Sequence, residues 1–309
     1  MLLGRVARMY YEHGMTHQEI ANALGLSRVR VTRLLAEARD KGLVEIVVHV
    51  EESLFADEER DLVARFGLRQ AWIAPNVPDA TKQDNAFAAV GADGLSSVLE
   101  KDATVAIGLS TAVALAASQF PAKHVGASFI PVAGSGSGLV NGANPHEIAL
   151  TLATRTSGRA FHLPAPLLAA DTGAAQSFYA EPGVVKMLDL AARADLLVVG
   201  VGGTGRNEGL LLSALTDDQR HQLVDSGAVG DISGRFFDAA GEAVTGPLDA
   251  RIVGLRLDAL RGIPNRLGIA RGASRVESLA VALRHGLLNM LVTDIDTATA
   301  LLRWDDAAH

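Results

Sequence analysis

Hydrophobic residues recur at intervals of three and four in three short segments near the N-terminus, a spacing typical of helices with one buried face. The first segment ends before Gly14. The second begins after Thr16 and carries Glu19 three positions later, the pattern of a capping box, and it ends at Gly25. The third begins after Ser27. The pattern therefore predicts three helices joined by short turns.

The third of these helices carries its apolar and its basic residues at different positions around the axis. Its apolar positions are Val31, Leu34, Leu35 and Ala38. Arg28, Arg30 and Arg33 fall outside that apolar face. After Gly42, the apolar residues Val44, Ile46 and Val48 fall on alternate positions, which predicts a short strand. Two helices, a glycine turn, a basic helix and a strand are together typical of a winged helix-turn-helix domain.

The pattern changes beyond residue 50. Residues 51–67 are acidic and amphipathic, which predicts a linker helix. From residue 68, short apolar runs alternate with helical stretches, the signature of an α/β fold with a mainly parallel sheet. The expected strands are 71–73, 104–108, 128–132, 160–163, 196–201, 252–257, 266–270 and 290–293. We therefore expect a small domain of residues 1–50, a linker helix of residues 51–67 and a large α/β domain of residues 68–309.

Length and composition fit this division. A chain of 309 residues is long enough for about two domains with their own cores. Cysteine is absent, which excludes disulfides, thiolate zinc sites and cysteine nucleophiles and fits a reducing compartment. No apolar run approaches the ~20 residues of a membrane span, and charged residues interrupt the N-terminal stretch where a signal peptide would be apolar. We therefore expect a cytoplasmic protein.

Charge is distributed unevenly along the chain. The net charge is −7, yet residues 1–50 hold seven basic and five acidic residues and so carry +2. The remainder holds 21 basic and 30 acidic residues and carries −9. A polyanion is therefore expected to contact the first fifty residues and not the rest of the chain.

The basic helix is the expected recognition helix, which in this motif lies in the major groove and presents its N-terminal residues to base edges. Arginine suits guanine O6 and N7, whereas other polar groups anchor phosphates. The alternative is a three-helix cap with a solvated basic face, but caps, glycine turn, clustered arginines and charge asymmetry together favour binding to double-stranded operator DNA. The expected DNA-binding residues are Thr16, Ser27, Arg28, Arg30, Thr32 and Arg33.

The run YYEHGMTHQEIANALGLSRVRVTRLLAEARDKGLVEIVV resembles the N-terminal domain of the SorC family of bacterial sugar-responsive transcriptional regulators. The resemblance continues through the acidic segment and through AIGLSTAV, GAVGDISGRFFD and MLVTDIDTATALL, so it covers nearly the whole chain. It implies a Rossmann-like effector domain similar to sugar-phosphate isomerases and deaminases. It also implies a small sugar, polyol or sugar phosphate as effector, and self-association as a dimer or, commonly, a tetramer.

Ligands of open α/β sheets bind at the carboxyl ends of strands, where helix N-termini offer free amides. Residues Gly108, Ser110 and Thr111 follow a predicted strand and open a helix, and the resemblance implies ligand contacts at this turn; a helix cap that binds nothing is the alternative. Gly134, Ser135 and Gly136 begin a second loop of small residues that we expect to face the pocket.

A third loop, residues 200–205, fits GxGxxG directly after a strand. Dinucleotide binding also needs an acidic residue at the end of the next strand, and Asp217, Asp218 and Asp225 lie instead in a polar helical segment. We therefore expect no nucleotide cofactor here. Gly202 and Gly203 are expected to form a backbone cradle for a sugar or its phosphate.

Asn144, Pro145, His146 and Glu147 allow two interpretations. Asn144 suits an N-cap, Pro145 the first helical position and Glu147 the third, so the start of a helix explains three of the four residues. His146 remains, and either it has no role in binding or it donates a hydrogen bond to a sugar hydroxyl from that helix start. We list Asn144 and His146 as candidate effector contacts.

The resemblance adds two further candidates. Asp231 occupies the position of a family acid that faces the ligand, with structural capping as the alternative. Arg275 stands where the family often has a lysine that holds a phosphate, and its planar fork would hold an anion in a different geometry. A phosphorylated effector and a free sugar or polyol both remain open.

The function expected from these features is regulation of a carbohydrate or polyol catabolic operon, as repressor or activator, without catalysis. No lysine lies in the glycine loops, which argues against a Schiff base, and no HExxH-like spacing indicates a metal. We therefore expect no cofactor. The alternative is a sugar-phosphate isomerase or deaminase that carries a DNA-binding extension.

Overall fold

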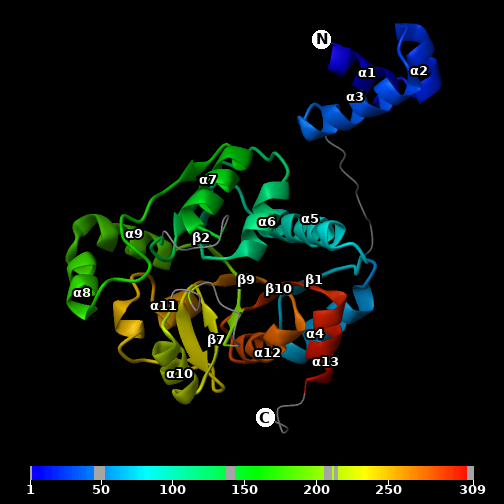
Figure 1. Ribbon diagram of the computed structural model, residues 1–309. Helices are drawn as coiled ribbons and strands as arrows, with labels where there is room; N and C mark the ends of the chain where they lie inside the picture. Colours follow the sequence, from blue (N-terminus) through cyan, green and yellow to red (C-terminus); the bar gives the residue numbers. More distant parts are fainter. Residues whose placement is uncertain (1, 45–52, 137–142, 205–210, 212–214, 305–309) are drawn as a thin grey trace. The chain divides into compact units, whose positions relative to one another are not determined.

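The computed structural model describes residues 2–44, 53–136, 143–204, 211 and 215–304. The chain forms two compact units, residues 1–52 and residues 53–309 (Figure 1). Each unit has its own hydrophobic core.

The small unit contains the three predicted helices, α1 (Leu2–Tyr11), α2 (His17–Leu24) and α3 (Arg28–Asp40). Their core is formed by Val6, Ile20 and Val31, which are fully buried. The predicted capping box is present, because the Thr16 hydroxyl accepts from the backbone N–H of Glu19 while the Glu19 side chain accepts from that of Thr16. The predicted strand over 44–48 lies, beyond residue 44, outside the described residues.

The large unit is built on a seven-stranded sheet in the order β1-β10-β9-β5-β2-β3-β4 with every neighbouring pair parallel, as an α/β fold requires. Its strands are β1 (Gln70–Ala74), β2 (Thr104–Ile107), β3 (Ser128–Pro131), β4 (Arg159–Ala160), β5 (Leu196–Val199), β9 (Asn265–Ile269) and β10 (Met290–Asp294). The predicted fold class is therefore confirmed, although β4 is shorter than the expected strand 160–163.

Helices cover both faces of this sheet (Figure 1). One face packs against α5 (Ala80–Val98), α6 (Thr111–Gln119) and α7 (Pro145–Thr156). The other face packs mainly against α4 (Ala56–Phe66), α9 (Pro182–Ala192), α12 (Val276–Arg284) and α13 (Ile295–Arg303). Because side chains alternate along a strand, Val105 and Ile107 enter the first core and Ala106 the second.

The acidic helix expected between the domains, α4, is part of the large unit. Its Leu62 is fully buried, and the Glu59 carboxylate accepts a hydrogen bond from the backbone N–H of Ile73 in β1 at 2.9 Å. The helix contacts β1 and α13. None of the described helices is long and apolar enough to cross a membrane.

A second sheet, of three antiparallel strands, was not expected. It consists of β6 (Gly202–Gly203), β7 (Ala228–Ile232) and β8 (Arg235–Asp238). Ser233 and Gly234 form the two-residue hairpin turn between β7 and β8, with φ of 54° and 84°. The remaining elements are α8 (Thr172–Ala180), α10 (Asp217–Asp225), α11 (Leu257–Gly262) and the short 3₁₀ helices Asp249–Arg251 and Ala273–Arg275.

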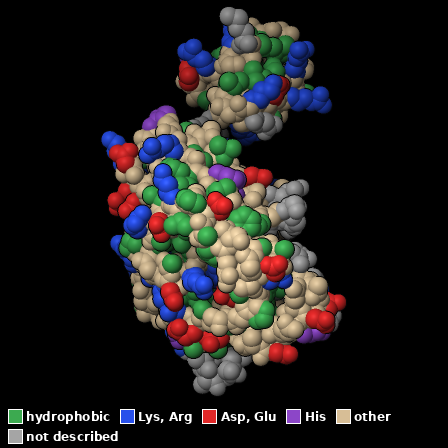
Figure 2. Space-filling view, turned by 90° about the vertical axis from the view of Figure 1, so that its left-hand side faces the viewer, with side chains coloured by type: hydrophobic (Ala, Val, Ile, Leu, Met, Phe, Trp, Pro, Cys, Tyr) green, Lys and Arg blue, Asp and Glu red, His purple; other side chains and the backbone are tan. Residues whose placement is uncertain are grey.

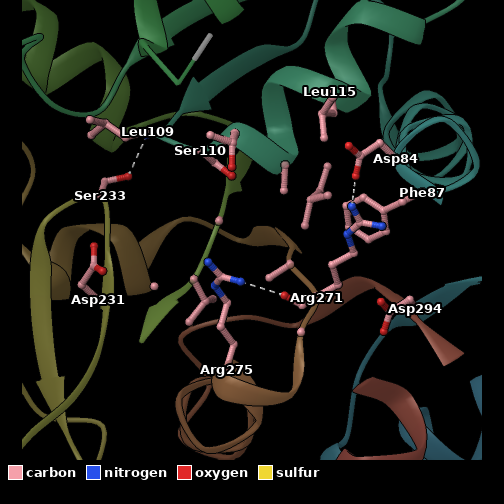
Figure 3. Close-up of a pocket in the computed structure, with 18 of the residues that line it drawn as sticks. Asp84, Phe87, Leu109, Ser110, Leu115, Asp231, Ser233, Arg271, Arg275 and Asp294 are labelled. Carbon is pink, nitrogen blue, oxygen red and sulfur yellow. Dashed lines mark hydrogen bonds and ion pairs between the residues drawn. The ribbon is translucent and has the colours of Figure 1, made fainter. Parts of the chain in front are cut away.

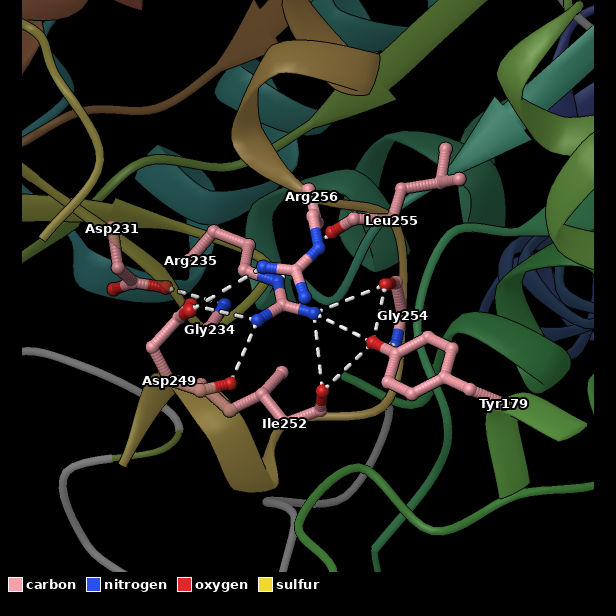
Figure 4. A network of polar contacts seen from close by, with 9 residues as sticks. All are labelled: Tyr179, Asp231, Gly234, Arg235, Asp249, Ile252, Gly254, Leu255 and Arg256. Atoms are coloured by element: carbon pink, nitrogen blue, oxygen red, sulfur yellow. Dashed lines mark hydrogen bonds and ion pairs between the residues drawn. The ribbon is translucent and has the colours of Figure 1, made fainter. Parts of the chain in front are cut away.

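The predicted strand 252–257 is wrong. Residues Ile252 and Gly254 form only isolated bridges, and α11 begins at Leu257. The buried Arg235 guanidinium donates to the carbonyl oxygens of Ile252, Gly254 and Leu255 at 2.9–3.0 Å, and the Tyr179 hydroxyl lies against the first two (Figure 4). Side chains thus satisfy backbone groups that a sheet ladder would otherwise satisfy, so the apolar run is buried without becoming a strand.

Candidate functional site

The candidate DNA-binding surface is the exposed side of α3. Arg28, Arg30 and Arg33 are all exposed, and within the described part of the chain none of their guanidinium groups has an ion-pair or hydrogen-bond partner. Two other basic residues of this unit are paired, Arg8 with Glu12 at 2.9 Å and Lys41 with Glu37 at 2.7 Å. On the visible face of the small unit, Lys and Arg outnumber acidic side chains, whereas the two kinds mix over the large unit (Figure 2). The three arginines are therefore available to phosphates and base edges.

Thr16 and Ser27 are the N-cap residues of α2 and α3, and their hydroxyl groups form hydrogen bonds within the protein. The Ser27 hydroxyl accepts from the backbone N–H of Arg30 at 3.2 Å, and the Thr16 hydroxyl donates to the Glu19 carboxylate at 2.8 Å. These bonds fix the N-termini of α2 and α3, where phosphates bind to helices. Both side chains are exposed, so these N-termini are open to solvent.

Thr32 is also exposed, and its hydroxyl lies 3.1 Å from the His17 imidazole and 3.1 Å from the Arg28 carbonyl oxygen. Val29, which is not among the expected DNA contacts, is 64% exposed on the same helix. An exposed valine among arginines gives no periodic signal, so only the structure draws attention to it.

The candidate effector site is a pocket of about 800 Å³ at the carboxyl ends of the central strands. The turns after β2, β5 and β9 line it, together with α5 and the β7–β8 hairpin (Figure 3). Of the expected residues, five line the pocket: Ser110, Thr111, Gly202, Asp231 and Arg275. The topological position agrees with the rule for open α/β sheets.

The turn after β2 shapes the pocket through close packing. Gly108 precedes it, and a Cβ at Gly108 would lie 2.2 Å from the Ser233 hydroxyl oxygen. A Cβ at Gly200 would likewise lie 2.4 Å from the Ser110 hydroxyl oxygen. Ser110 is the N-cap of α6 and accepts from the backbone N–H of Val113 at 3.2 Å. Glycine at positions 108 and 200 thus allows three chain segments to meet around the start of α6.

The β7–β8 hairpin brings a buried carboxylate to the pocket. Asp231 is 8% exposed, and its carboxylate accepts from the backbone N–H of Gly234 at 2.9 Å. Burial raises the pKa of Asp231 to about 6, although the Gly234 hydrogen bond and the charge of Arg275 oppose the shift. Beside it, the Ser233 hydroxyl accepts from the backbone N–H of Leu109 at 3.3 Å, which joins the hairpin to the turn after β2.

A buried ion pair supports this hairpin from behind. Arg235 donates to the Asp249 carboxylate at 2.7 Å and to the Tyr179 hydroxyl at 2.9 Å, and its side chain is only 4% exposed (Figure 4). These contacts fix the strand that follows the Ser233–Gly234 turn and so hold Asp231 at the pocket wall.

Two arginines enter the pocket from the segment after β9. Arg275 donates to the carbonyl oxygen of Arg271 at 3.0 Å, which leaves its other N–H groups facing the pocket (Figure 3). Arg271 is ion-paired with Asp84 of α5, and its guanidinium lies 4.6 Å from the centre of the Phe87 ring. The pocket therefore offers fixed donors and buried carboxylates together, a combination suited to hydroxyl groups or to an anion.

Several expected contacts lie elsewhere. Gly203 pairs with Gly230 in the small sheet and does not line the pocket, and neither does Gly108, although it supports the pocket from behind. Gly134 is buried against the backbone of Pro166, where a Cβ would meet the carbonyl oxygen at 2.3 Å, so packing explains it. Ser135 pairs with residues 165–167 and Gly136 is exposed outside the pocket, while residues 137 and 138 lie outside the described residues.

Asn144 and His146 also lie outside the pocket. Asn144 is the N-cap of α7 and accepts from the backbone N–H of His146 at 3.0 Å, with Pro145 at the first helical position as predicted. The His146 ring lies against that of His162, with centroids 4.1 Å apart. Burial and the neighbouring His162 lower the pKa of His146 to about 4, so the ring is neutral at pH 7. Helix initiation explains Asn144 and Pro145, whereas both ring nitrogens of His146 are buried without a hydrogen-bond partner among the described residues.

The α5 side of the pocket has no signature in the sequence. Gln83, Asp84 and Phe87 of α5 line it, with Asp294 at the start of α13. The Gln83 side-chain oxygen accepts from the backbone N–H of Val77 at 2.5 Å, while its amide nitrogen is buried without a hydrogen-bond partner. Asp79 at the N-cap predicts where α5 begins, but no local pattern indicates which of its turns faces a ligand. Within the described residues, no three His, Asp or Glu side chains are grouped to hold a metal ion.

Comparison with known proteins places both units. Residues 51–303 match the family model described as "Putative sugar-binding domain", and residues 14–44 match that of bacterial regulatory proteins of the crp family. The transcriptional regulator LsrR of Escherichia coli is 29% identical over 307 residues, which cover 97% of this chain and 94% of that protein.

Solved structures share the fold. The full-length sorbitol operon regulator SorC from Klebsiella pneumoniae superposes with a TM-score of 0.79 at 24% identity, covering 97% of this chain and 98% of that chain. A DeoR family transcriptional regulator from Listeria monocytogenes superposes with a TM-score of 0.73 at 24% identity, covering 79% of this chain and 98% of the other.

Proposed function

The chain belongs to the SorC family of sugar-binding transcriptional regulators, and from this premise we propose that it controls a carbohydrate or polyol operon. The small unit holds operator DNA. A small sugar, polyol or sugar phosphate bound in the large unit sets the affinity of the small unit for operator DNA. Such a protein acts where the DNA is, which in a bacterium is the cytoplasm.

One observation carries this proposal. The same chain presents a helix with three exposed, unpaired arginines and a separate pocket in which Asp231 and Arg275 line the wall beside the start of α6. The arginines suit a polyanion, whereas the pocket suits a ligand of one or two sugar units. For one ligand to control the binding of another, a protein needs two distinct sites, and this chain has two sites of different chemistry.

Within the pocket we assign each group a role. Asp231, when ionised, accepts hydrogen bonds from vicinal hydroxyls. Arg275 and the free amides at the start of α6, by Thr111, hold the most electron-rich end of the ligand, which is a phosphate where the effector carries one. Ser110 and Gly108 keep that helix start in place. Binding is non-covalent and needs no cofactor.

Coupling to DNA follows from the position of α4. This helix directly follows the segment from the small unit and packs on β1 and α13. Asn76 after β1 and Asp294 before α13 both line the pocket. We propose that the effector favours one arrangement of these elements and hence one arrangement of subunits, because a ligand shifts an equilibrium only by its difference in affinity for the two states. Since one helix-turn-helix reads one half-site, the working form is a dimer or tetramer.

A thermal-shift screen of the full chain against free sugars, polyols and their phosphates tests the proposal, because a ligand that binds only the folded state raises the melting temperature. The stabilising compound is then added to gel shifts with the DNA upstream of the protein's own gene, at several salt concentrations. We expect retention that weakens steeply with salt and changes with the compound. Turnover of a sugar phosphate without DNA retention would instead support the isomerase or deaminase alternative.

A further inference from the structure

The exposed side of α3 is not uniformly charged. Val29 is 64% exposed, and Thr32 lies one turn further along the same side, since residues three apart are neighbours on a helix surface. Arg33 is four residues from Val29, and Arg28 is four residues from Thr32. A small apolar strip therefore lies between the arginines on the helix expected to enter the major groove.

The hydroxyl of Thr32 is turned back onto the protein. It donates to the Arg28 carbonyl oxygen at 3.1 Å, and its oxygen also lies 3.1 Å from His17 Nδ1, from which it accepts in the tautomer that carries the Nδ1 proton. The His17 ring is itself held, because it packs against the Tyr10 ring of α1 with centroids 5.0 Å apart. The Thr32 rotamer is thus fixed by contacts from α1, α2 and α3.

Because the protein holds the Thr32 hydroxyl, the methyl group is the part of this exposed side chain that is left to meet a base. If its hydroxyl were free it would suit donors and acceptors on any base pair, but a methyl group suits only the apolar feature of the major groove, the C5 methyl of thymine. Val29 offers the same chemistry beside it. The arginines are not substitutes, because their forks match guanine or phosphate oxygens.

We propose that Val29 and the methyl group of Thr32 determine part of the operator sequence by packing against thymine C5 methyl groups, and that His17 is a positioning residue that orients Thr32. This inference rests on the proposed DNA-binding function, and it adds which base feature the helix reads. It assigns specificity to the apolar strip and affinity mainly to the three arginines.

The full chain is used to select duplexes from a random-sequence library, and affinities are then measured for the selected duplex and for copies in which deoxyuridine replaces one thymidine at a time. The replacement removes only the C5 methyl. At one or two positions of each half-site we expect wild-type binding to weaken about fourfold per methyl, the value of one buried carbon group. Thr32→Ser should bind the thymidine duplex about fourfold more weakly and lose its response at one position, and Val29→Ala should lose its response at the adjacent one.

Two variants act as controls. Thr32→Val keeps the methyl group while removing the hydroxyl, so its response to deoxyuridine should persist. Thr154→Ser removes the same methyl from an exposed threonine of α7 whose hydroxyl makes the same bond to a carbonyl four residues earlier, and it should behave as wild type. A wild-type protein that selects a sequence but responds equally to thymidine and deoxyuridine everywhere would overturn this inference alone. Failure to select any sequence would overturn the proposed function with it.

Discussion

Arginine serves opposite purposes in the two units. On α3, Arg28, Arg30 and Arg33 are exposed and none is paired within the described residues. In the pocket, Arg271 is paired with Asp84 and stacked on Phe87, and Arg275 is anchored to a carbonyl oxygen. The first group is exposed to water and unpaired, and the second is held in place by contacts with the protein.

The difference follows from the ligand each surface meets. DNA presents a long row of phosphates, and flexible arginines can each find one while releasing counterions. A small ligand presents few groups, so a pocket must hold its donors in place beforehand or lose affinity in ordering them. The comparison predicts that removing exposed arginines changes DNA affinity strongly and stability little, whereas pocket substitutions change ligand binding and, where the substituted group is a buried charge, stability as well.

The largest effect is expected from removing two arginines of α3 together. Arg30→Ala with Arg33→Ala removes two charge-assisted contacts worth about 1–3 kcal/mol each, so DNA affinity should fall by at least about thirtyfold. A gel-shift titration measures the loss, and the salt dependence should also become shallower. Effector-induced thermal stabilisation should be unchanged. If it disappears as well, the two sites are not separate in the way the comparison requires.

Asp231→Asn tests the difference between the two surfaces through the stability of the protein. Burial raises the pKa of Asp231 from 3.8 to about 6, so at pH 7 the folded protein holds a carboxylate in a site that disfavours its charge, at a cost of at most about 3 kcal/mol. Since the folded state binds the proton more tightly, the contribution of Asp231 falls as pH rises from about 4 to about 6 and then stays level. Asparagine removes the charge, so we expect the free variant to melt several degrees higher at pH 7.

The same variant should lose most of its response to the effector, because the carboxylate accepts from ligand hydroxyls and an amide accepts less well. Melting curves at pH 5 and pH 7 check the prediction, since the gain in stability should shrink at the lower pH. A variant that melts lower than wild type at both values would mean that Asp231 stabilises its hairpin instead of serving a ligand.

Arg275→Gln is expected to have a somewhat smaller effect, confined to binding. Loss of one charge-assisted hydrogen bond to an anionic ligand costs about 1.5–3 kcal/mol, or roughly 10-fold to 100-fold in affinity. Calorimetric titration with a sugar phosphate and with the corresponding free sugar separates the cases. A larger loss for the phosphate supports contact between Arg275 and the phosphate, and equal losses would place the phosphate elsewhere. Arg275→Lys, which keeps the charge but not the fork, should recover part of the affinity.

Much of this arrangement can be predicted from the sequence because it is local. Thr16 and Glu19 lie three residues apart and form their capping box whatever surrounds them, and the glycine at position 25 adopts the left-handed conformation that ends α2. The parallel strands are short apolar runs that any α/β packing would bury. These features depend on neighbours within one helical turn or one strand.

The α5 side of the pocket could not be predicted in this way. Arg271 contacts Asp84, which lies 187 residues away in the sequence. The buried amide nitrogen of Gln83 can be recognised as a pocket group only once it is known that this turn of α5 faces the pocket. For the same reason the glycines at 134 and 108 look alike in sequence, although one is packed against Pro166 and the other supports the pocket turn. A glycine-rich loop predicts close approach of two chain segments, not which segments approach.

The smallest effect is expected from Asp84→Asn, which tests whether the ion pair with Asp84 holds Arg271 in the pocket. The Asp84 side chain is 51% exposed, so its ion pair with Arg271 is expected to contribute under about 1 kcal/mol, and Asp84→Asn should shift the melting temperature by no more than about 4 °C. Freed from its partner, Arg271 keeps its position over Phe87 but carries an uncompensated charge. We therefore expect an anionic sugar to bind the variant relatively better than a neutral one, measured as a ratio of dissociation constants.

Asp57→Asn provides the control, because Asp57 forms a more exposed pair with Arg60 on α4, with side chains 82% and 75% exposed, and does not line the pocket. Its melting temperature should shift by a similarly small amount, while its ratio of affinities for anionic and neutral sugars stays at the wild-type value. If Asp84→Asn also leaves that ratio unchanged, Arg271 does not meet the ligand, and among the described residues that line the pocket the cation that does so is Arg275. A changed ratio in Asp84→Asn alone would instead show that the α5 side of the pocket, invisible to sequence patterns, helps choose the effector.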